Sequence, residues 1–476
     1  MTTATIAASE PAAPPPDDSV ATMPRRWVRC SVLAAIVVVA LAIRWRFLGF
    51  ETMDYRAFVS RWYDTLDSQG FSAFREQFAD YNYPYLYLLW LLTVLHVPSL
   101  VGAKALAIVF DFVLGFFAYR IVALRTARFW LRAAAFGVVV LLPSVIANSA
   151  IWGQADAIYS AFAVGGVYFL LRAQNHRLVW NSVWACVFFG VAVAFKLQAI
   201  FVFPLLLWLL ARRRLPWYSL LAIPAVYVLL DLPAVLAGAS WSDALSVYLN
   251  QTDSYKELTL GAANLYQLIP ISGDATWLAH LGIGAAVAVI VAFLAWSVWN
   301  KPPVTPTTIL LVATASAVIV PFLLPAMHDR YFYIAEVLSV ITAFYLPLRF
   351  VLIPILVQAA AIGVYHSSLT GDQGHMMGGG FGGGHGGPPP DGYGGNPSGA
   401  GQSGHTGHPG GDHPDGGHWG GGPGGHPGGS GRGVGGGYTS GRGDTALTLY
   451  GSLMAAAVLG VVYAVVDTFH KAVSRR

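Results

Sequence analysis

Charged residues are scarce in this sequence. Asp, Glu, Lys and Arg make up 11% of its 476 residues, whereas soluble domains carry roughly 25%. Hydrophobic residues make up 55%, and the mean hydropathy is +0.55. So few charges cannot cover the surface of a soluble protein of this length, which excludes an ordinary cytosolic enzyme. The composition predicts an all-α, polytopic membrane protein.

Cysteines and the common nucleotide-binding patterns are also scarce or missing. Cys30 and Cys186 lie in or beside apolar runs without CxxC spacing, which argues against a disulfide framework or a zinc site. No P-loop or HExxH pattern occurs, and the Gly-rich insert matches no phosphate-binding motif in the strand-to-helix context that such a motif requires. We therefore predict no metal site, no cofactor and no nucleic-acid partner. Because a soluble nucleotide-binding fold has no room here, any sugar that is transferred must reach the outer leaflet already attached to a lipid.

The sequence contains a series of apolar runs instead. We predict about twelve membrane-spanning helices, one for each run. The predicted range is 11–13, because several runs are short for a hydrocarbon core of about 30 Å. The first run follows three arginines and has no small-residue cleavage site after it, which favours a retained helix over a signal peptide. The runs lie near residues 30–49, 101–122, 133–150, 156–172, 180–195, 197–211, 216–238, 277–297, 307–325, 331–346, 350–366 and 446–467.

The basic loops give the orientation of these helices. With the N-terminus in the cytoplasm, all of the basic loops fall on the cytoplasmic side, as the positive-inside rule requires. A crossing at 84–97 would move the arginines of 120–132 outside, so we predict an interfacial or partly embedded helix there. Both termini are then cytoplasmic in a cell-membrane protein. The predicted outer loops are 50–83, 151–155, 239–276 and 326–330.

Composition divides the chain into four parts. Residues 1–24 are rich in Ala, Pro and Thr and are predicted to be a disordered cytoplasmic tail, before a transmembrane domain at 25–370. Residues 371–445 hold 35 of the 52 glycines and seven histidines, which predicts a disordered external loop. Its histidines suit either a solvated linker or weak divalent-metal binding. Residues 446–476 are predicted to form the last transmembrane helix and a basic cytoplasmic tail.

The first outer loop contains the strongest candidate for chemistry. Phe58, Trp62 and Leu66 recur at the spacing of an amphipathic interfacial helix. Asp54 lies where this helix meets the membrane, a costly place for a carboxylate without a role or a partner. It suits either a general base for an acceptor hydroxyl or the N-cap of a helix starting near Tyr55.

Two further outer segments carry polar and aromatic residues. In the segment 80–85, Pro84 fits the first turn of a helix that Asp80 or Asn82 caps, although its aromatic residues also suit an interface belt or a sugar-stacking surface. The turn 148–156 contains Trp152, Gln154 and Asp156. It is interpreted as a binding turn, with a simple helix-dipole role for Asp156 as the alternative.

Two cationic positions suit a phosphate. Lys196 lies in an apolar stretch, where it either binds phosphate or extends to the membrane interface. His328, Asp329 and Arg330 lie between two helices. A histidine beside an arginine on the outer face suits phosphate, and an ordinary polar turn is the alternative.

Taken in order, these segments resemble a known family. The chain reads MDYRAF, RWYDTL, DYNYPY, NSAIWGQADAIY, AFKLQAIFVFP, GAANLYQL and MHDRYFY. This series resembles the GT-C superfamily of integral-membrane glycosyltransferases, in particular bacterial proteins grouped with the GPI mannosyltransferase II family. The order also parallels the dolichyl-phosphate-glucose glucosyltransferases. The resemblance covers roughly residues 45–335.

The resemblance implies a reaction. It implies inverting transfer of a hexose, mannose or glucose, from a polyprenyl-phosphate donor at the outer leaflet, without a metal. The acceptor would be a glycan, lipid or protein of the cell envelope. The second proline of the family's Y-P-P stretch is Tyr85 here, and the second turn reads WGQAD instead of the eukaryotic pattern. The identity of the acceptor therefore does not carry over.

The resemblance and the residue patterns together assign candidate roles. Asp54 matches the family's catalytic base, and His328 and Arg330 match an H-E-K motif near the donor phosphate, with Asp329 in place of Glu. The candidates for donor binding are Lys196, His328, Arg330, Asp156, Gln154, Trp152 and Asn264. The candidates for acceptor binding or cavity lining are Tyr55, Asp80, Tyr81, Tyr266 and Asp329.

Two other classes of function fit parts of the sequence. A transporter or flippase of lipid-linked sugars would use the intramembrane charges as a translocation path, but transporters commonly show repeated halves and this chain shows none. A scaffold in an envelope assembly would explain the Gly/His-rich loop but not the ordered polar turns. The sequence does not define an oligomeric state.

Overall fold

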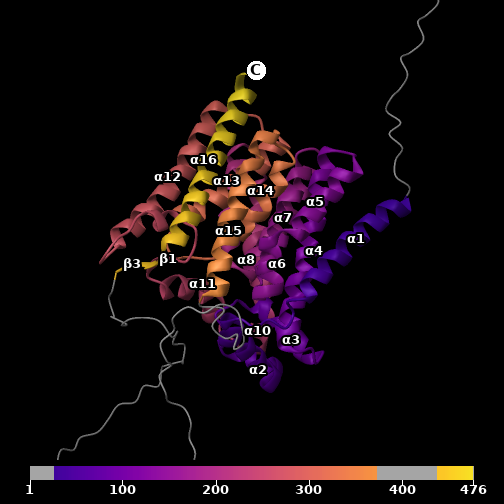
Figure 1. Ribbon diagram of the computed structural model, residues 1–476, viewed down its shortest axis with the longest axis vertical. Helices are drawn as coiled ribbons and strands as arrows, with labels where there is room; N and C mark the ends of the chain where they lie inside the picture. The colour runs from indigo at the N-terminus through magenta and orange to yellow at the C-terminus, as the bar shows by residue number, and fades with distance from the viewer. Residues whose placement is uncertain (1–25, 372–436, 475–476) are drawn as a thin grey trace, which may run out of the picture. The chain divides into compact units, whose positions relative to one another are not determined.

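Helices account for nearly all of the regular structure (Figure 1). The computed structural model describes residues 26–371 and 437–474. The predicted tail (1–24) and most of the predicted Gly/His/Pro-rich loop lie outside the described residues. Within the described part, sixteen α-helices are joined by turns, short 3₁₀ or π segments and three short strands, which confirms the all-α prediction.

The helices follow one another closely along the chain. In order they are α1 (Arg26–Trp45), α2 (Ser60–Gln69), α3 (Tyr83–Val94), α4 (Ser99–Arg125), α5 (Phe129–Leu141), α6 (Pro143–Ile146), α7 (Asp156–Ala173), α8 (Leu178–Phe195), α9 (Phe203–Ala211), α10 (Ala222–Ala237), α11 (Trp241–Ser254), α12 (Thr276–Asn300), α13 (Pro306–Leu323), α14 (Tyr333–Ala343), α15 (Leu352–Thr370) and α16 (Thr445–Ser474). The strands are β1 (Glu257–Leu260), β2 (Met327–His328) and β3 (Thr439–Arg442).

Eight helices in the described residues are long and apolar enough to span a membrane, or nine if the bent pair Phe129–Leu141 and Pro143–Trp152 is one span. Three other predicted runs form α7 and the shorter apolar helices Leu197–Ala211 and Tyr333–Ala343. This is the architecture of an all-α polytopic membrane protein, with fewer spans by length than the twelve predicted. The run predicted to be interfacial forms the 12-residue helix α3.

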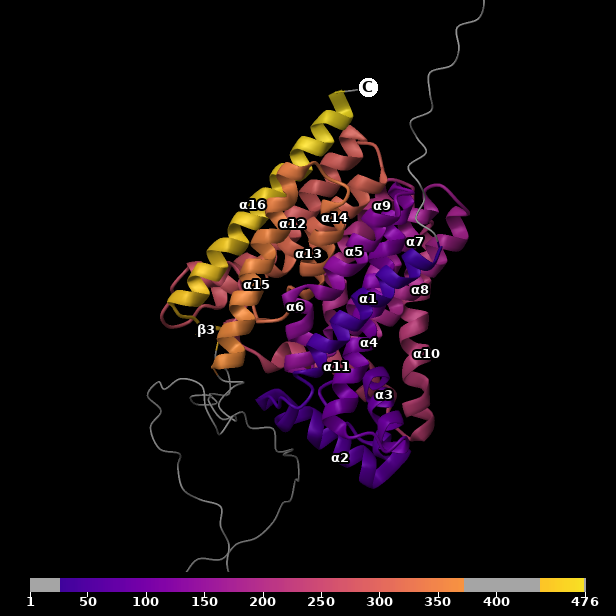
Figure 2. The same cartoon turned by 45° about the vertical axis from the view of Figure 1, so that its right-hand side comes forward.

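The helices at the periphery of the bundle expose apolar surface that suits contact with lipid. Helix α1 runs along the flank of α4 and α5 (Figure 2), and little of its surface is buried by protein. Trp45 and Val38 on α1 and Trp299 on α12 are largely exposed. Apolar surface on this scale is unusual for a soluble protein, whereas a bilayer would cover it.

Helix α7 lies at the centre of the core. Nearly all of its residues are buried, consistent with a sequence that is apolar on every face. Its Gly165 and Gly166 face α8 closely, because an added Cβ would lie 2.5 Å from the Phe188 ring and 2.8 Å from the Phe189 ring. Since Asp156 is its first residue, this rigid helix fixes one side of the candidate site.

A bend after α5 leads the chain into the site. The helix axis turns by 44° at Pro143, which cannot continue the hydrogen bonding of the preceding helix. Residues Ala147–Trp152 then form a π-helical segment, a rare geometry that is frequent at functional sites. Gly153 ends it in the left-handed conformation (φ 78°), which glycine adopts without strain. Residues 153–156 follow directly and complete the polar turn predicted at 148–156.

The segment between α1 and α3 contains an amphipathic helix, as predicted, whereas its place at the membrane interface stays a prediction. Trp62 and Leu66 on α2 are buried, with Phe58 packed against the same cluster. The Trp62 ring lies 5.3 Å from the ring of Tyr81, just before α3. This apolar stripe is therefore covered by protein, and it holds the segment that contains Asp54 in place.

The three strands form a parallel sheet in the order β2–β1–β3. Leu260 on β1 pairs with His328 on β2 and with Arg442 on β3. Because β3 lies inside 371–445, the prediction of disorder is wrong for residues 439–442. These residues lack apolar periodicity, and pairing with β1 orders them.

Candidate functional site

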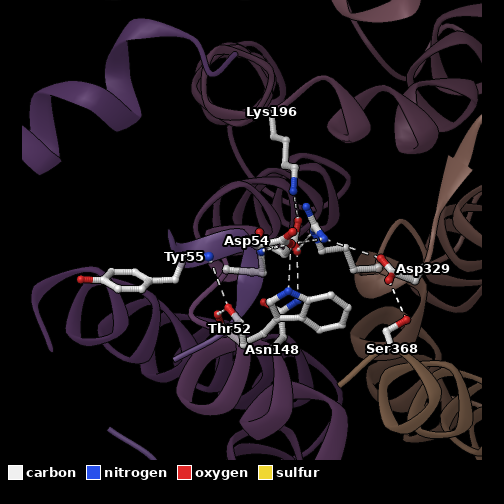
Figure 3. A network of polar contacts seen from close by, with 11 residues as sticks. Thr52, Asp54, Tyr55, Asn148, Lys196, Asp329 and Ser368 are labelled. Atoms are coloured by element: carbon white, nitrogen blue, oxygen red, sulfur yellow. Dashed lines mark hydrogen bonds and ion pairs between the residues drawn. The ribbon is translucent and has the colours of Figure 1, made fainter. Parts of the chain in front are cut away.

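The carboxylate of Asp54 is the meeting point of three distant segments (Figure 3). Its Oδ2 accepts hydrogen bonds from Trp152 Nε1 at 2.9 Å, from Gln154 Nε2 at 2.9 Å and from Arg330 Nη1 at 3.0 Å. Trp152 and Gln154 belong to the polar turn, and Arg330 follows β2. The three donors fix the orientation of a partly buried carboxylate.

A second carboxylate, that of Asp156, lies beside the first. Its Oδ1 forms an ion pair with Lys196 Nζ, and its Oδ2 accepts a hydrogen bond from Asn148 Nδ2 at 2.9 Å. The Asp156 side chain is 1% exposed and that of Lys196 is 10% exposed. Burial makes an unpaired charge costly, so loss of either partner would be strongly destabilising. The helix-dipole alternative for Asp156 thus gives only part of its role.

Arg330 connects the carboxylates to one another. Besides Asp54, its guanidinium lies 3.8 Å from Asp156 Oδ2 and 3.6 Å from Asp329 Oδ1. It also stacks on the Trp152 ring, with its Cζ 5.3 Å from the ring centroid. A planar guanidinium can bond several carboxylates while stacking on an aromatic face, which an ammonium cannot do as well.

The local backbone explains how Asp54 reaches this position. Asp54 has helical dihedral angles itself, and Thr52 Oγ1 accepts the hydrogen bond from the backbone N–H of Tyr55 at 3.3 Å. The hydroxyl of Thr52 in turn donates to the carbonyl of Trp152 at 3.2 Å. The N-cap alternative for Asp54 is therefore wrong, because Thr52 does the capping and leaves the Asp54 carboxylate to the site.

Burial and neighbouring charges shift the pKa values of several groups at this site. Burial opposes the charge of Arg330, but Asp54, Asp329 and Asp156 more than compensate, so its pKa lies above its usual value. Burial raises the pKa of the Asp329 carboxyl, and Arg330 and the hydrogen bond from Ser368 oppose that rise. Burial and the charge of Asp156 both raise the pKa of Tyr81, which keeps its phenol neutral.

Only some of the other predicted residues lie beside this cluster. Lys196 Nζ is 5.6 Å from the centroid of the Tyr81 ring. The His328 ring lies 4.8 Å from the ring of Tyr255, whose pKa burial and the charge of Asp80 raise. Tyr55 points away from the cluster (Figure 3), and its hydroxyl hydrogen-bonds with that of Ser99 at 2.7 Å.

The candidates Asn264 and Tyr266 make structural contacts instead. Asn264 is fully buried and donates to the carbonyl of Leu258 at 3.3 Å. The Tyr266 hydroxyl donates to the carbonyl of Leu323 at 2.8 Å, in a space that Gly282 leaves open. Their proposed roles in the cavity stay predictions.

Sequence reasoning gave no role to three residues that hold the site. Thr52 links the first loop to the polar turn, Asn148 bonds Asp156, and Ser368 Oγ donates to Asp329 Oδ2 at 2.8 Å. Asn148 precedes Asp156 by eight residues in the same predicted turn, so its polarity was a usable signal. Ser368 lies just beyond the apolar run 350–366, and nothing in the sequence links it to Asp329. Among residues 26–371 and 437–474, no group of three or more His, Cys, Asp or Glu side chains is arranged to hold a metal ion.

No protein-family model matches the sequence, and comparisons with curated proteins and with solved structures likewise give no match. The resemblance to GT-C glycosyltransferases stays a prediction.

Proposed function

We propose that the protein is an inverting glycosyltransferase that moves a hexose from a polyprenyl-phosphate donor to an envelope acceptor. One observation carries this proposal. Asp54, the Trp152–Asp156 turn, Lys196 and Arg330 come from four of the segments that give the resemblance, and they form one network of ion pairs and hydrogen bonds. Convergence of these segments is what a shared active site requires, whereas unrelated polar turns need not meet.

In the proposed step, Asp54 accepts the proton of the acceptor hydroxyl. The acceptor oxygen then attacks the anomeric carbon of the sugar from the face opposite the phosphate. The bond from that carbon to the phosphate oxygen breaks, and its electron pair stays on the phosphate. Polyprenyl phosphate leaves with one more negative charge, and the configuration at the anomeric carbon inverts.

Cationic side chains supply the stabilisation of the leaving phosphate in this proposal. Lys196 and Arg330 carry the charge, with His328 on the neighbouring strand as a further donor. Before the donor binds, Arg330 is held by Asp54 at 3.0 Å. The donor phosphate would compete for that guanidinium, which would free Asp54 to act on the acceptor hydroxyl.

The proposal includes a membrane topology. If α7, Leu197–Ala211, α14 and the bent pair also cross the bilayer, the chain has the twelve crossings that place both termini in the cytoplasm. Asp54, Asp156, Asp329 and Arg330 then lie at the outer face, where a lipid-linked donor would present its sugar. The basic loops support this orientation through the positive-inside rule.

The test uses the full-length protein in lipid nanodiscs. It is supplied with a panel of polyprenyl-phosphate sugars and an envelope extract as acceptor source, and the release of polyprenyl phosphate is measured. We expect release with a mannose or glucose donor and a product of inverted configuration. A lack of release with every donor, together with transport of the same lipids between leaflets, would replace the enzyme by a flippase.

A further inference from the structure

A second arginine lies next to the candidate site, brought there by β3. Leu260 on β1 pairs with His328 on one side and with Arg442 on the other. The strands β2 and β3 are therefore separated by two strand spacings of about 4.8 Å each, a gap across which the long side chain of Arg442 can extend toward the residues that follow His328. Sequence reasoning placed Arg442 in a disordered loop and gave it no role.

The side chain of Arg442 approaches Asp329. A Cβ atom added to Gly261 would lie 3.7 Å from Arg442 Nη1 and 3.7 Å from Asp329 Cβ. Both side chains therefore lie within van der Waals contact of the same position beside Gly261. The positive charge of Arg442 also counteracts the rise in the pKa of Asp329 that burial causes.

The backbone of β3 is held firmly at this point. The carbonyl of Arg442 accepts a hydrogen bond from Gln267 Nε2 at 2.9 Å. Gly441 pairs with Thr259 at positive φ (79°), and a Cβ there would lie 2.1 Å from the Thr259 carbonyl oxygen. The close approach requires glycine at 441, and it fixes the place from which Arg442 extends.

The sharing of Arg330 gives a residue at this place a role. In the ion pairs described above, the single guanidinium of Arg330 is shared among three carboxylates, Asp54, Asp156 and Asp329. Arg442 brings a further positive charge beside Asp329, the carboxylate that otherwise draws on Arg330.

We propose that Arg442 is a positioning residue that shares the charge of Asp329, so that Arg330 remains directed at Asp54 and, once a lipid-linked sugar binds, is available to its phosphate. The role toward phosphate rests on the proposed function. The coupling between Arg442 and Asp329 does not rest on it, and it can be measured without substrate.

The experiment is a double-mutant cycle on the full-length protein: Arg442→Ala, Asp329→Asn and both together. Lys256→Ala serves as control, because it removes an exposed cation just before β1. Melting temperatures are measured first. We expect Arg442→Ala to lower the melting temperature, and we expect Asp329→Asn to recover part of that loss, because it removes the charge left with a single guanidinium. Simple addition of the two shifts would overturn the proposal.

The second readout is the KM for the donor. Arg442→Ala is expected to raise KM by about tenfold, the size of one lost charge-assisted contact, with a smaller change in kcat. Lys256→Ala should leave KM unchanged, and adding Asp329→Asn to Arg442→Ala should bring KM back toward the wild-type value. A raised KM that Asp329→Asn does not correct would contradict positioning through Asp329. Coupled melting temperatures in a protein that transfers no sugar would refute the proposed function and leave the coupling in place.

Discussion

Arg330 Nη1 lies 3.0 Å from Asp54 Oδ2, although 276 positions separate the two residues in the chain. Their side chains are 16% and 18% exposed, so water screens the pair only partly. The contact ties the segment after β2 to the segment between α1 and α2. It keeps together a carboxylate and a guanidinium from opposite ends of the domain.

The first prediction concerns Arg330 itself. Arg330→Lys keeps the charge but loses the planar fork that reaches Asp54, Asp156 and Asp329, so we expect transfer to fall by about 100-fold in kcat/KM, or roughly 2.7 kcal/mol. Arg330→Ala should be worse, because it leaves carboxylates short of a cation. Rates are measured by release of polyprenyl phosphate. Full activity in the lysine variant would mean that the fork geometry is irrelevant.

The second prediction concerns the buried pair of Lys196 and Asp156. Lys196→Met leaves a carboxylate that is 1% exposed without its main partner, which should cost about 3–5 kcal/mol of stability. Asp156→Asn should also destabilise, and the double variant should lose less than the sum of the two. Thermal unfolding in detergent measures all three. Strict additivity would show that the two side chains do not interact in the folded protein.

The third prediction concerns Thr52, which joins the loop of Asp54 to the turn of Trp152. Thr52→Val keeps the shape but removes both hydrogen bonds, so we expect a loss of about 1–3 kcal/mol and weaker transfer. Thr52→Ser should restore both. Thr65→Val is the control, since its hydroxyl bonds only within α2, to the carbonyl of Arg61. Equal effects at positions 52 and 65 would argue against a link specific to the site.

The fourth prediction concerns a buried pair that holds α1 to the bundle. Arg44 donates to Asp111 Oδ2 at 2.8 Å, and Ser149 in the π-helical segment donates to the same oxygen at 2.6 Å. Arg44→Met should cost about 3–5 kcal/mol by leaving Asp111 unpaired. Adding Asp111→Leu should recover much of it. If Arg44→Met melts like the wild type, the pair does not anchor α1.

Sequence reasoning located much of this site for a physical reason. A charge such as Lys196 in an apolar run must find a partner, and a polar turn between two apolar helices must face water or a binding site. Asp156 and Arg330 were found by the same logic. The reasoning could identify these residues without knowing which of them pair, because pairing depends on how the helices pack.

Other parts could not be predicted, for equally specific reasons. Arg44 reads as part of an apolar helix, and its partner Asp111 is 67 positions away. Arg442 lies among glycines, where no periodicity marks a four-residue strand that forms only by pairing with β1. The apolar stripe of α2 has the same spacing whether lipid or α3 covers it. In each case the deciding contact is between segments far apart in the sequence.

The most direct test of the central claim compares two matched variants, Asp54→Asn and Asp64→Asn. Both remove one carboxylate from the segment between α1 and α3, but Asp64 is exposed on α2. Single-turnover release of polyprenyl phosphate is measured in nanodiscs at equal amounts of folded protein. We predict wild-type rates for Asp64→Asn and a loss of at least about 100-fold for Asp54→Asn, as expected for removal of a general base. A wild-type rate in Asp54→Asn would contradict the account.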